Sequence, residues 1–154
     1  MFYRTDQPHG MKHNPFKSLV VPRPIGWVSS LDAQGRGNLA PFSFFNAVAA
    51  APPIVVLGCN GWHGQGGDKD TLQNIKATGE FVVNIATWDL RDAMNKTSAS
   101  APHGEDEMAL AGLEAAPSKL VKPPRVAASP VNLECVLLQT VALPADNPDE
   151  PNNT

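Results

Sequence analysis

The chain has 154 residues, of which 42% are hydrophobic and 18% are charged, so it is long enough for one domain with a buried core. The formal net charge of -3 leaves no broad basic surface, and we therefore expect no nucleic-acid partner. No segment approaches the roughly 20 apolar residues that span a bilayer, and the first residues do not resemble a secretion signal, so we expect a cytoplasmic protein without membrane contact. Fifteen prolines and 12 glycines indicate many short elements between turns, which favours a mainly β fold.

The first third of the chain predicts an arm followed by a β-hairpin. Residues 1–16 are polar and have no sustained hydrophobic period, so we expect an arm that packs on the domain or on a partner subunit. Residues 25–31 and 37–40 read as paired strands, because the Asp- and Gly-containing segment between them suits a reversal of the chain. The alanine-rich residues 44–51 predict a short helix that Pro52 and Pro53 end, and a buried strand follows at 54–57.

The middle of the chain predicts short helices alternating with strands. A glycine-rich loop at 60–68 leads into a helix, where Asp70 and Gln73 have the spacing of a capping box and Gly79 is the stop. We expect a strand at 81–85 and a helix at 88–95. The last predicted elements are an irregular flap at 96–106, a helical turn at 108–113 and a long strand at 132–141.

The end of the chain, residues 144–154, is acidic and rich in proline, so we expect a disordered polar tail after a domain that covers residues 17–143. Cys59 and Cys135 lie in apolar segments without the spacing of a metal site, and we expect buried reduced thiols. His9 and His13 also lack ligand spacing, and the motifs of metalloproteases and serine hydrolases are missing from the sequence. We therefore predict no metal site and no catalytic acid, base or nucleophile.

Two segments carry groups that could bind a small molecule. Residues 38–46 place amide and hydroxyl groups beside three phenylalanines, which suits a flat heteroaromatic ring, although a core hairpin has the same pattern. Residues 69–71 lie at a predicted helix start, where Lys69, Thr71 and free backbone N–H groups could hold a phosphomonoester. The alternative is that Asp70 or Thr71 caps the helix and that Lys69 is solvated.

These motifs together resemble the flavin reductase-like family of FMN-binding split barrels. The resemblance begins with Arg23-Pro24, Ser29-Ser30 and Asn38-Leu-Ala-Pro-Phe-Ser43. It continues through Pro52-Pro53-Ile-Val-Val, Lys69-Asp-Thr-Leu-Gln-Asn-Ile75, Gly79-Glu-Phe-Val-Val-Asn84 and Ser129-Pro-Val-Asn-Leu-Glu-Cys135. The resemblance implies a mainly β, antiparallel, Greek-key-like split β-barrel with short peripheral helices, assembled as a homodimer. Family members usually continue into a further strand, so we expect a C-terminally truncated domain.

The resemblance also implies the site and the chemistry. It assigns FMN binding to Ser29, Ser30, Leu31, Asn38, Ala40, Pro41, Ser43, Phe44, Phe45, Asn46, Lys69, Asp70 and Thr71. We expect hydride transfer from NADH or NADPH to the flavin, and then electron transfer to a partner oxygenase or another acceptor. Arg23, His63 and His103 are weaker candidates for contacts with the substrate, since solvated loop histidines and surface arginines are common. Two alternatives remain open: an FMN-bound electron relay without a nicotinamide site, and an inactive truncated remnant.

Overall fold

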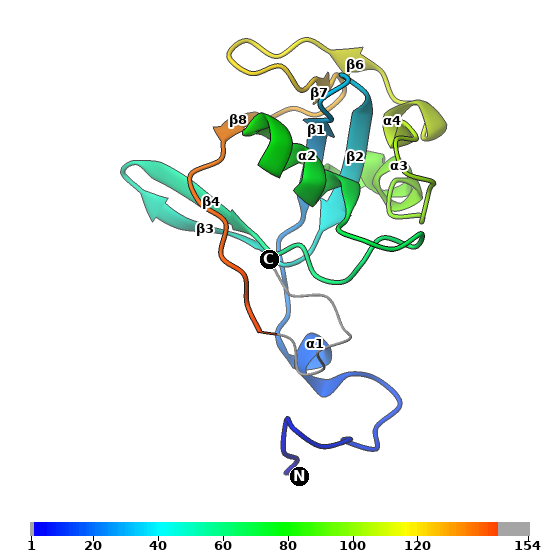
Figure 1. Ribbon diagram of the computed structural model, residues 1–154, viewed down its shortest axis with the longest axis vertical. Coiled ribbons are helices and arrows are strands. Elements are labelled where there is room, and N and C mark those ends of the chain that lie inside the picture. The colour runs from blue at the N-terminus through cyan, green and yellow to red at the C-terminus, as the bar shows by residue number, and fades with distance from the viewer. Residues whose placement is uncertain (1, 145–154) are drawn as a thin grey trace.

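The computed structural model describes residues 2–144 and contains a four-stranded antiparallel sheet (Figure 1). The order across this sheet is β2-β1-β5-β8, and β1 pairs along its length with β2. The predicted hairpin is thus confirmed, with strands one or two residues different from those expected. The strands are β1 (Gly26–Leu31), β2 (Gly37–Phe42), β5 (Glu80–Asn84) and β8 (Asn132–Val136).

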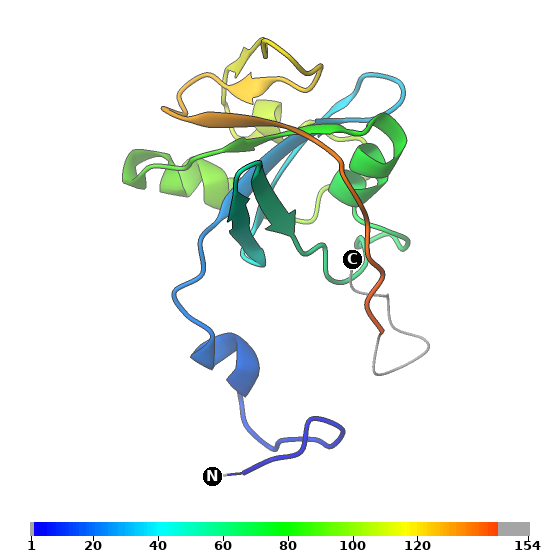
Figure 2. The same ribbon diagram turned by 90° about the vertical axis from the view of Figure 1, so that its left-hand side faces the viewer.

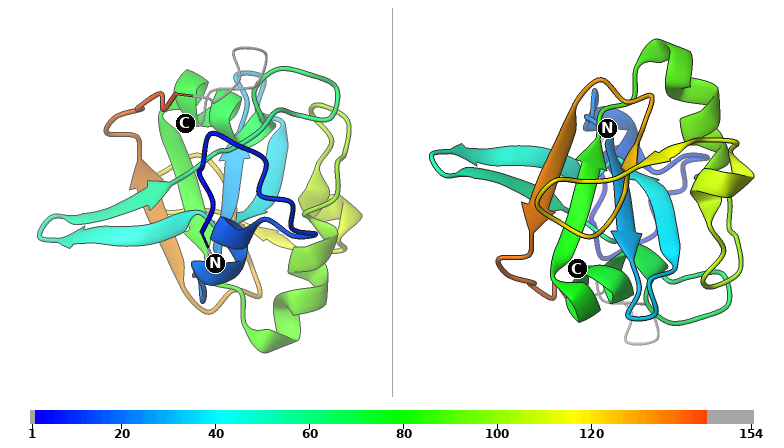
Figure 3. Two further views of the ribbon diagram at one scale, coloured as in Figure 1. Left: turned by 90° about the horizontal axis from the view of Figure 1, so that it is seen from below. Right: turned by 90° about the horizontal axis from the view of Figure 1, so that it is seen from above.

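A second hairpin replaces the helix that the alanines predicted. β3 (Phe45–Ala50) pairs with β4 (Pro53–Leu57) in antiparallel register, with Ala47 opposite Val55. The hairpin projects sideways from the main sheet (Figure 3). The helix prediction is wrong because alanine's helix propensity is only a weak preference, and the backbone pairing with β4 outweighs it. The turn at Ala51 and Pro52 brings the two strands together.

The helix α2 (Asp70–Thr78) packs on β1 and β2 and ends at Gly79, as predicted. Gly79 has a φ of 74°, the left-handed conformation that favours glycine at a helix end. The capping box is wrong, because Lys69 is the N-cap residue and makes no side-chain cap bond. The Asp70 carboxylate instead accepts hydrogen bonds from the flap, so it cannot cap its own helix.

The remaining elements are short and lie around the sheet. The predicted helical segment near Trp88 is confirmed, whereas the long strand predicted to reach residue 141 ends at Val136. Residues 2–25 extend away from the sheet and include one helix (Figure 2). The predicted polar tail lies, from residue 145 on, outside the described residues. The short elements are α1 (Pro15–Leu19), η1 (Trp88–Leu90), α3 (Arg91–Lys96), α4 (Glu107–Leu110), β6 (Ala115–Ala116) and β7 (Arg125–Val126).

Hydrophobic residues fill both faces of the main sheet. One cluster, which includes Val28, Phe42 and Leu72, lies between the sheet and α2. The other contains Trp27 and Leu39 and packs against α4 and β7. Cys59 belongs to the first cluster, and burial raises the pKa of its thiol to about 11, so it is an unreactive core residue. Within residues 2–144, no helix is both long enough and apolar enough for a membrane crossing.

Asn84 joins three strands through one fully buried side chain. Its Nδ2 donates to the Trp27 carbonyl at 3.0 Å and to Ser29 Oγ at 3.2 Å. Its Oδ1 accepts from Val126 N and from Asn132 Nδ2, each at 2.8 Å. The side chain therefore satisfies polar groups of β1, β7 and β8 in a region without access to water.

We expect Asn84→Ala to lower the free energy of unfolding by at least about 2 kcal/mol, because each buried group left without a partner costs roughly 1–3 kcal/mol. Chemical denaturation measures this change. Asn95→Ala, at an exposed position of α3, is the control and should stay within about 0.5 kcal/mol of the wild type. Equal effects of the two variants would show that the Asn84 network does not stabilise the sheet.

Candidate functional site

A cavity of about 170 Å³ lies where β2 meets the start of α2. Asn38, Ala40 and Pro41 line it from β2, and Lys69, Asp70 and Thr71 line it from the start of the helix. Two loops complete the wall: the glycine loop, residues 60–68, and the flap, which spans residues 97–106 because α3 ends at Lys96. The structure thus brings the two predicted ligand-binding segments to one cavity.

The inner wall of the cavity is polar and tightly organised. The Asn38 amide donates to Thr71 Oγ1 at 2.8 Å, and both side chains are almost fully buried. One turn later, the Asn74 amide donates to Ser30 Oγ at 3.1 Å. These bonds fix α2 against the hairpin, and they point the first turn of the helix at the cavity. The first N–H groups of a helix have no acceptor within the helix, so they are available to an anion.

Glu107 is a buried carboxyl in the wall of this cavity and is not among the site residues predicted from the sequence. Its Oε2 accepts a hydrogen bond of 2.9 Å from the Leu39 N–H, which faces away from β1 at the edge of the sheet. Burial raises the pKa of the Glu107 carboxyl above its ordinary value, because the charged form loses water, and the bond from Leu39 opposes this effect. The only sequence signal at this position is the run of three acidic residues at 105–107, and because such runs are usually solvated it does not indicate a buried carboxyl.

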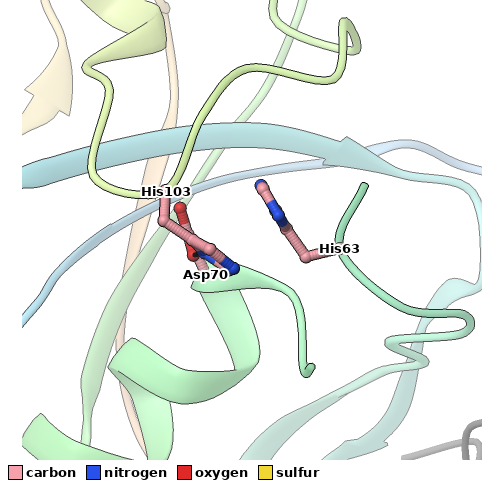
Figure 4. Close-up of side chains that lie close together, drawn as sticks. All are labelled: His63, Asp70 and His103. Carbon is pink, nitrogen blue, oxygen red and sulfur yellow. Dashed lines mark hydrogen bonds and ion pairs between the residues drawn. The ribbon is translucent and has the colours of Figure 1, made fainter. Parts of the chain in front are cut away.

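A histidine from each loop lies near the start of α2, where His63 stacks on His103 and His103 contacts Asp70 (Figure 4). His103 Nδ1 contacts Asp70 Oδ1, and the Gly104 N–H donates to Asp70 Oδ2 at 3.1 Å. The rings of His63 and His103 are stacked, with centroids 3.6 Å apart and planes at 24°. Interaction with the Asp70 carboxylate raises the pKa of His103. The pair thus connects the glycine loop and the flap to the start of α2.

Among the described residues, His63, Asp70 and His103 form the one group with three potential metal-binding atoms within 4.8 Å of one another. Their geometry does not suit a metal ion. Nitrogen lone pairs lie in the plane of an imidazole, so those of two stacked rings do not converge on one point. Each ring nitrogen of both histidines also has a hydrogen-bond partner.

Several residues expected at the site do not line the cavity. Ser29 and Ser30 are fully buried, and their hydroxyls bond to the Pro124 carbonyl and to Asn74. Ser43 receives a long bond of 3.4 Å from Arg23, whose guanidinium lies 5.6 Å from the centre of the Phe44 ring. Leu31 pairs with Gly37 in the main sheet. Phe45 packs against the core, and Asn46 is exposed on β3.

Comparison with known proteins shows which family this chain belongs to. The model of the flavin reductase like domain matches residues 18–147. An uncharacterized protein from Deinococcus radiodurans is 37% identical over 146 residues, which is 92% of this chain. The chain spans 64% of the length of that relative.

Solved structures agree with the family match. The crystal structure of nitrilotriacetate monooxygenase component B from Bacillus cereus is 32% identical to this chain, with a TM-score of 0.81. The match covers 92% of this chain and 72% of the Bacillus cereus chain. A Shewanella frigidimarina crystal structure described as having a split barrel domain is 22% identical, with a TM-score of 0.73. The match covers 83% of this chain and 62% of the Shewanella chain. This second likeness shows the fold alone.

We expect Glu107→Gln to change how stability depends on pH, because the variant keeps an acceptor for Leu39 but cannot ionise. A carboxyl with a raised pKa stabilises the fold below its ordinary value of 4.5, and this contribution is lost as the pH rises through the raised value. Denaturation at a series of pH values should therefore show the wild type losing stability relative to the variant over that interval. Glu105→Gln tests the effect of net charge alone, and parallel curves for Glu107→Gln and wild type would contradict the assignment.

Proposed function

The chain belongs to the flavin reductase-like family of split barrels, and we propose that it binds FMN in the cavity between β2 and α2 and transfers hydride from NADH or NADPH to it. The observation that carries the proposal is the meeting of residues 38–41 and 69–71 at one cavity. These segments lie far apart in the sequence and carry different chemistry. Together they suit a ligand with a phosphate at one end and a ring with polar edges at the other.

The start of α2 fits the phosphate. Lys69 is half-buried at the N-cap, and the first turn of α2 adds backbone N–H groups and the positive end of the helix dipole. Asp70 would repel a phosphate, but its carboxylate is already held by His103 and by the Gly104 N–H. The Asp70 side chain is therefore proposed to position the flap and not to contact the ligand directly.

The β2 side of the cavity fits the ring. Ala40 and Pro41 present small apolar surfaces, and Asn38 presents an amide at the inner wall. A volume of about 170 Å³ is below the range of roughly 300–1,000 Å³ that is usual for ligand sites, so the ring would extend past this cavity. Residues 43–46 follow β2 directly in the sequence, and we keep them as part of the proposed site.

The chemistry needs little from ionisable side chains. FMN, when bound, supplies the ring atom that accepts a hydride. The protein then has to hold the two rings face to face and exclude water, which is mainly a matter of position. The glycine loop and the flap can serve this role, because both line the cavity.

We also propose a homodimer and an acceptor protein. The β3–β4 hairpin projects from the domain with Val48 62% exposed and Val56 49% exposed, and a second copy could cover it. The acceptor proposal rests on the similar protein from Bacillus cereus, whose name identifies it as a component of a monooxygenase. An oxygenase that consumes reduced flavin is therefore the favoured partner.

Lys69→Ala should weaken FMN binding roughly 10- to 100-fold and leave riboflavin binding almost unchanged, because riboflavin has no phosphate for the lysine to contact. Fluorescence titration of both flavins measures the two affinities. Lys119→Ala removes the same charge from an exposed loop and serves as the matched control. Equal weakening of both flavins by Lys69→Ala would refute the phosphate assignment.

Anaerobic addition of NADH or NADPH should bleach the absorbance of the FMN-loaded protein, and the faster nicotinamide identifies the donor. Bleaching by dithionite alone would favour an electron relay without a nicotinamide site. Protein that does not bind added FMN would contradict both functions. The titration is best run on this chain and on a longer relative, because the chain covers 64% of the relative described above.

A further inference from the structure

We propose that His63 and His103 form a proton-operated latch that holds the glycine loop and the flap closed over the cavity. Protonated His103 closes the latch, and loss of its proton removes one of the two ring bonds and loosens the two loops. The latch itself is a property of the flavin-free chain. Its effect on a phosphorylated ligand rests on the proposed function.

The hydrogen bonds of His103 require a protonated ring. Its Nδ1 faces the Asp70 carboxylate, and its Nε2 lies 3.2 Å from the Gly66 carbonyl oxygen. Both partners can only accept, so both ring nitrogens must carry hydrogens. A neutral imidazole has a single N–H group, and it would lose either the bond to α2 or the bond to the glycine loop.

The hydrogen bonds of His63 require a neutral ring. Its Nδ1 accepts from the Gln65 N–H at 3.1 Å, and its Nε2 lies 2.9 Å from the Ala101 carbonyl, to which it must donate. A neutral ring thus lies 3.6 Å from a charged one. This arrangement is favourable, because the face of the neutral ring attracts a cation, whereas two charged rings would repel.

These bonds connect the glycine loop, the flap and α2 with one another. Gln65 Oε1 accepts from the His103 N–H at 3.0 Å, and the Gly104 N–H donates to Asp70. Gly104 has a φ of 75°, a left-handed conformation that residues with a Cβ rarely adopt, so a larger residue would strain the flap at this point. The contacts between the loops therefore depend on a small set of bonds around His103.

The charges around His103 favour the protonated form overall. Asp70 makes the largest contribution and raises the pKa of His103, and the Gly66 carbonyl adds to the effect. A histidine with a raised pKa stabilises the closed form below its ordinary pKa of 6.5, and this contribution is lost as the pH rises through the raised value. The other charged or titratable groups that face His103, lie near it in the sequence or line the two neighbouring cavities are His63, Asp32, Arg36, Lys69, Glu105, Asp106 and Glu107.

Release of the proton has two consequences for a phosphorylated ligand. A neutral His103 gives up one of its two ring bonds, so the connection between the loops and α2 is weakened and the ligand escapes more easily. The Asp70 carboxylate also loses its cationic partner, next to Lys69 at the proposed phosphate position. Both changes weaken FMN binding as the pH rises, and only the first affects riboflavin. FMN affinity should therefore fall more steeply with pH than riboflavin affinity.

Amide hydrogen exchange in the flavin-free protein tests the latch without any ligand. The reporters are the amides of Gln65, His103 and Gly104, corrected at each pH for their intrinsic exchange rates, and amides of β1 and β5 are the internal reference. NMR titration of the His103 ring gives its pKa in the same samples. His103→Gln and Asp70→Asn remove the charge pair, and His13→Gln, in the exposed arm, is the matched control.

We expect the protection of these amides to fall as the pH rises through the measured pKa of His103. Linkage requires about a tenfold fall for each unit by which that pKa exceeds the pKa of the open form. Both latch variants should lack the step, and Asp70→Asn should also lower the pKa of His103. His13→Gln should behave as the wild type.

Protection that does not change through the His103 pKa, or that changes equally in His103→Gln, would overturn the latch. FMN and riboflavin titrations between pH 7 and 9, where the phosphate is already a dianion, add the ligand test. A steeper loss of FMN binding in wild type than in His103→Gln supports the proposal, and identical slopes contradict it. If neither flavin binds, the proposed function fails, while the exchange data still decide the latch.

Discussion

The contact between the first hairpin and α2 is the constraint on which the site depends. Two side-chain bonds, from Asn38 to Thr71 and from Asn74 to Ser30, hold the helix at a fixed angle to β1 and β2. All four side chains are buried, so each bond also satisfies groups that could not reach water. These bonds add to the hydrophobic packing of α2 on the sheet, and together they keep the helix start facing β2 across the cavity. The glycine loop and the flap then add a cover to a wall that is already fixed.

The sequence predicted those parts of the fold that local chemistry determines. The β1–β2 hairpin followed from the Asp- and Gly-containing segment between its strands, and the end of α2 followed from Gly79. The second hairpin could not be predicted in this way, because alanines at 47, 49 and 50 form a strand only when β4 lies beside them. The length of β8 also depends on its pairing with β5, which ends at Val136. Local preference and long-range pairing disagree at these positions, and the pairing decides the outcome.

The sequence indicated which segments line the cavity, but it did not indicate which way their side chains point. Residues 38–41 and 69–71 do reach one cavity, yet Ser29 and Ser30 point into the protein and bond to Pro124 and Asn74. A run of hydroxyl residues indicates polar contacts without indicating their partner. Glu107 was missed for a related reason, since its role depends on the unpaired Leu39 N–H at the sheet edge. That partner is 68 positions away in the sequence and becomes visible only in the folded chain.

The charges of the cavity explain how one wall can hold carboxylates beside the position proposed for a phosphate. Lys69 is the cation at the start of α2, and Asp70 and Glu107 line the same space. Each carboxyl is compensated in a different way: Asp70 by His103 and the Gly104 N–H, and Glu107 by the Leu39 N–H and by burial that favours its neutral form. The charge that a ligand meets therefore depends on protons held by neighbours and not on the number of acidic residues. His103 in the flap contacts both the Gly66 carbonyl of the glycine loop and the Asp70 carboxylate next to Lys69. A change in this one side chain can therefore alter both the cover of the cavity and the charge beside Lys69.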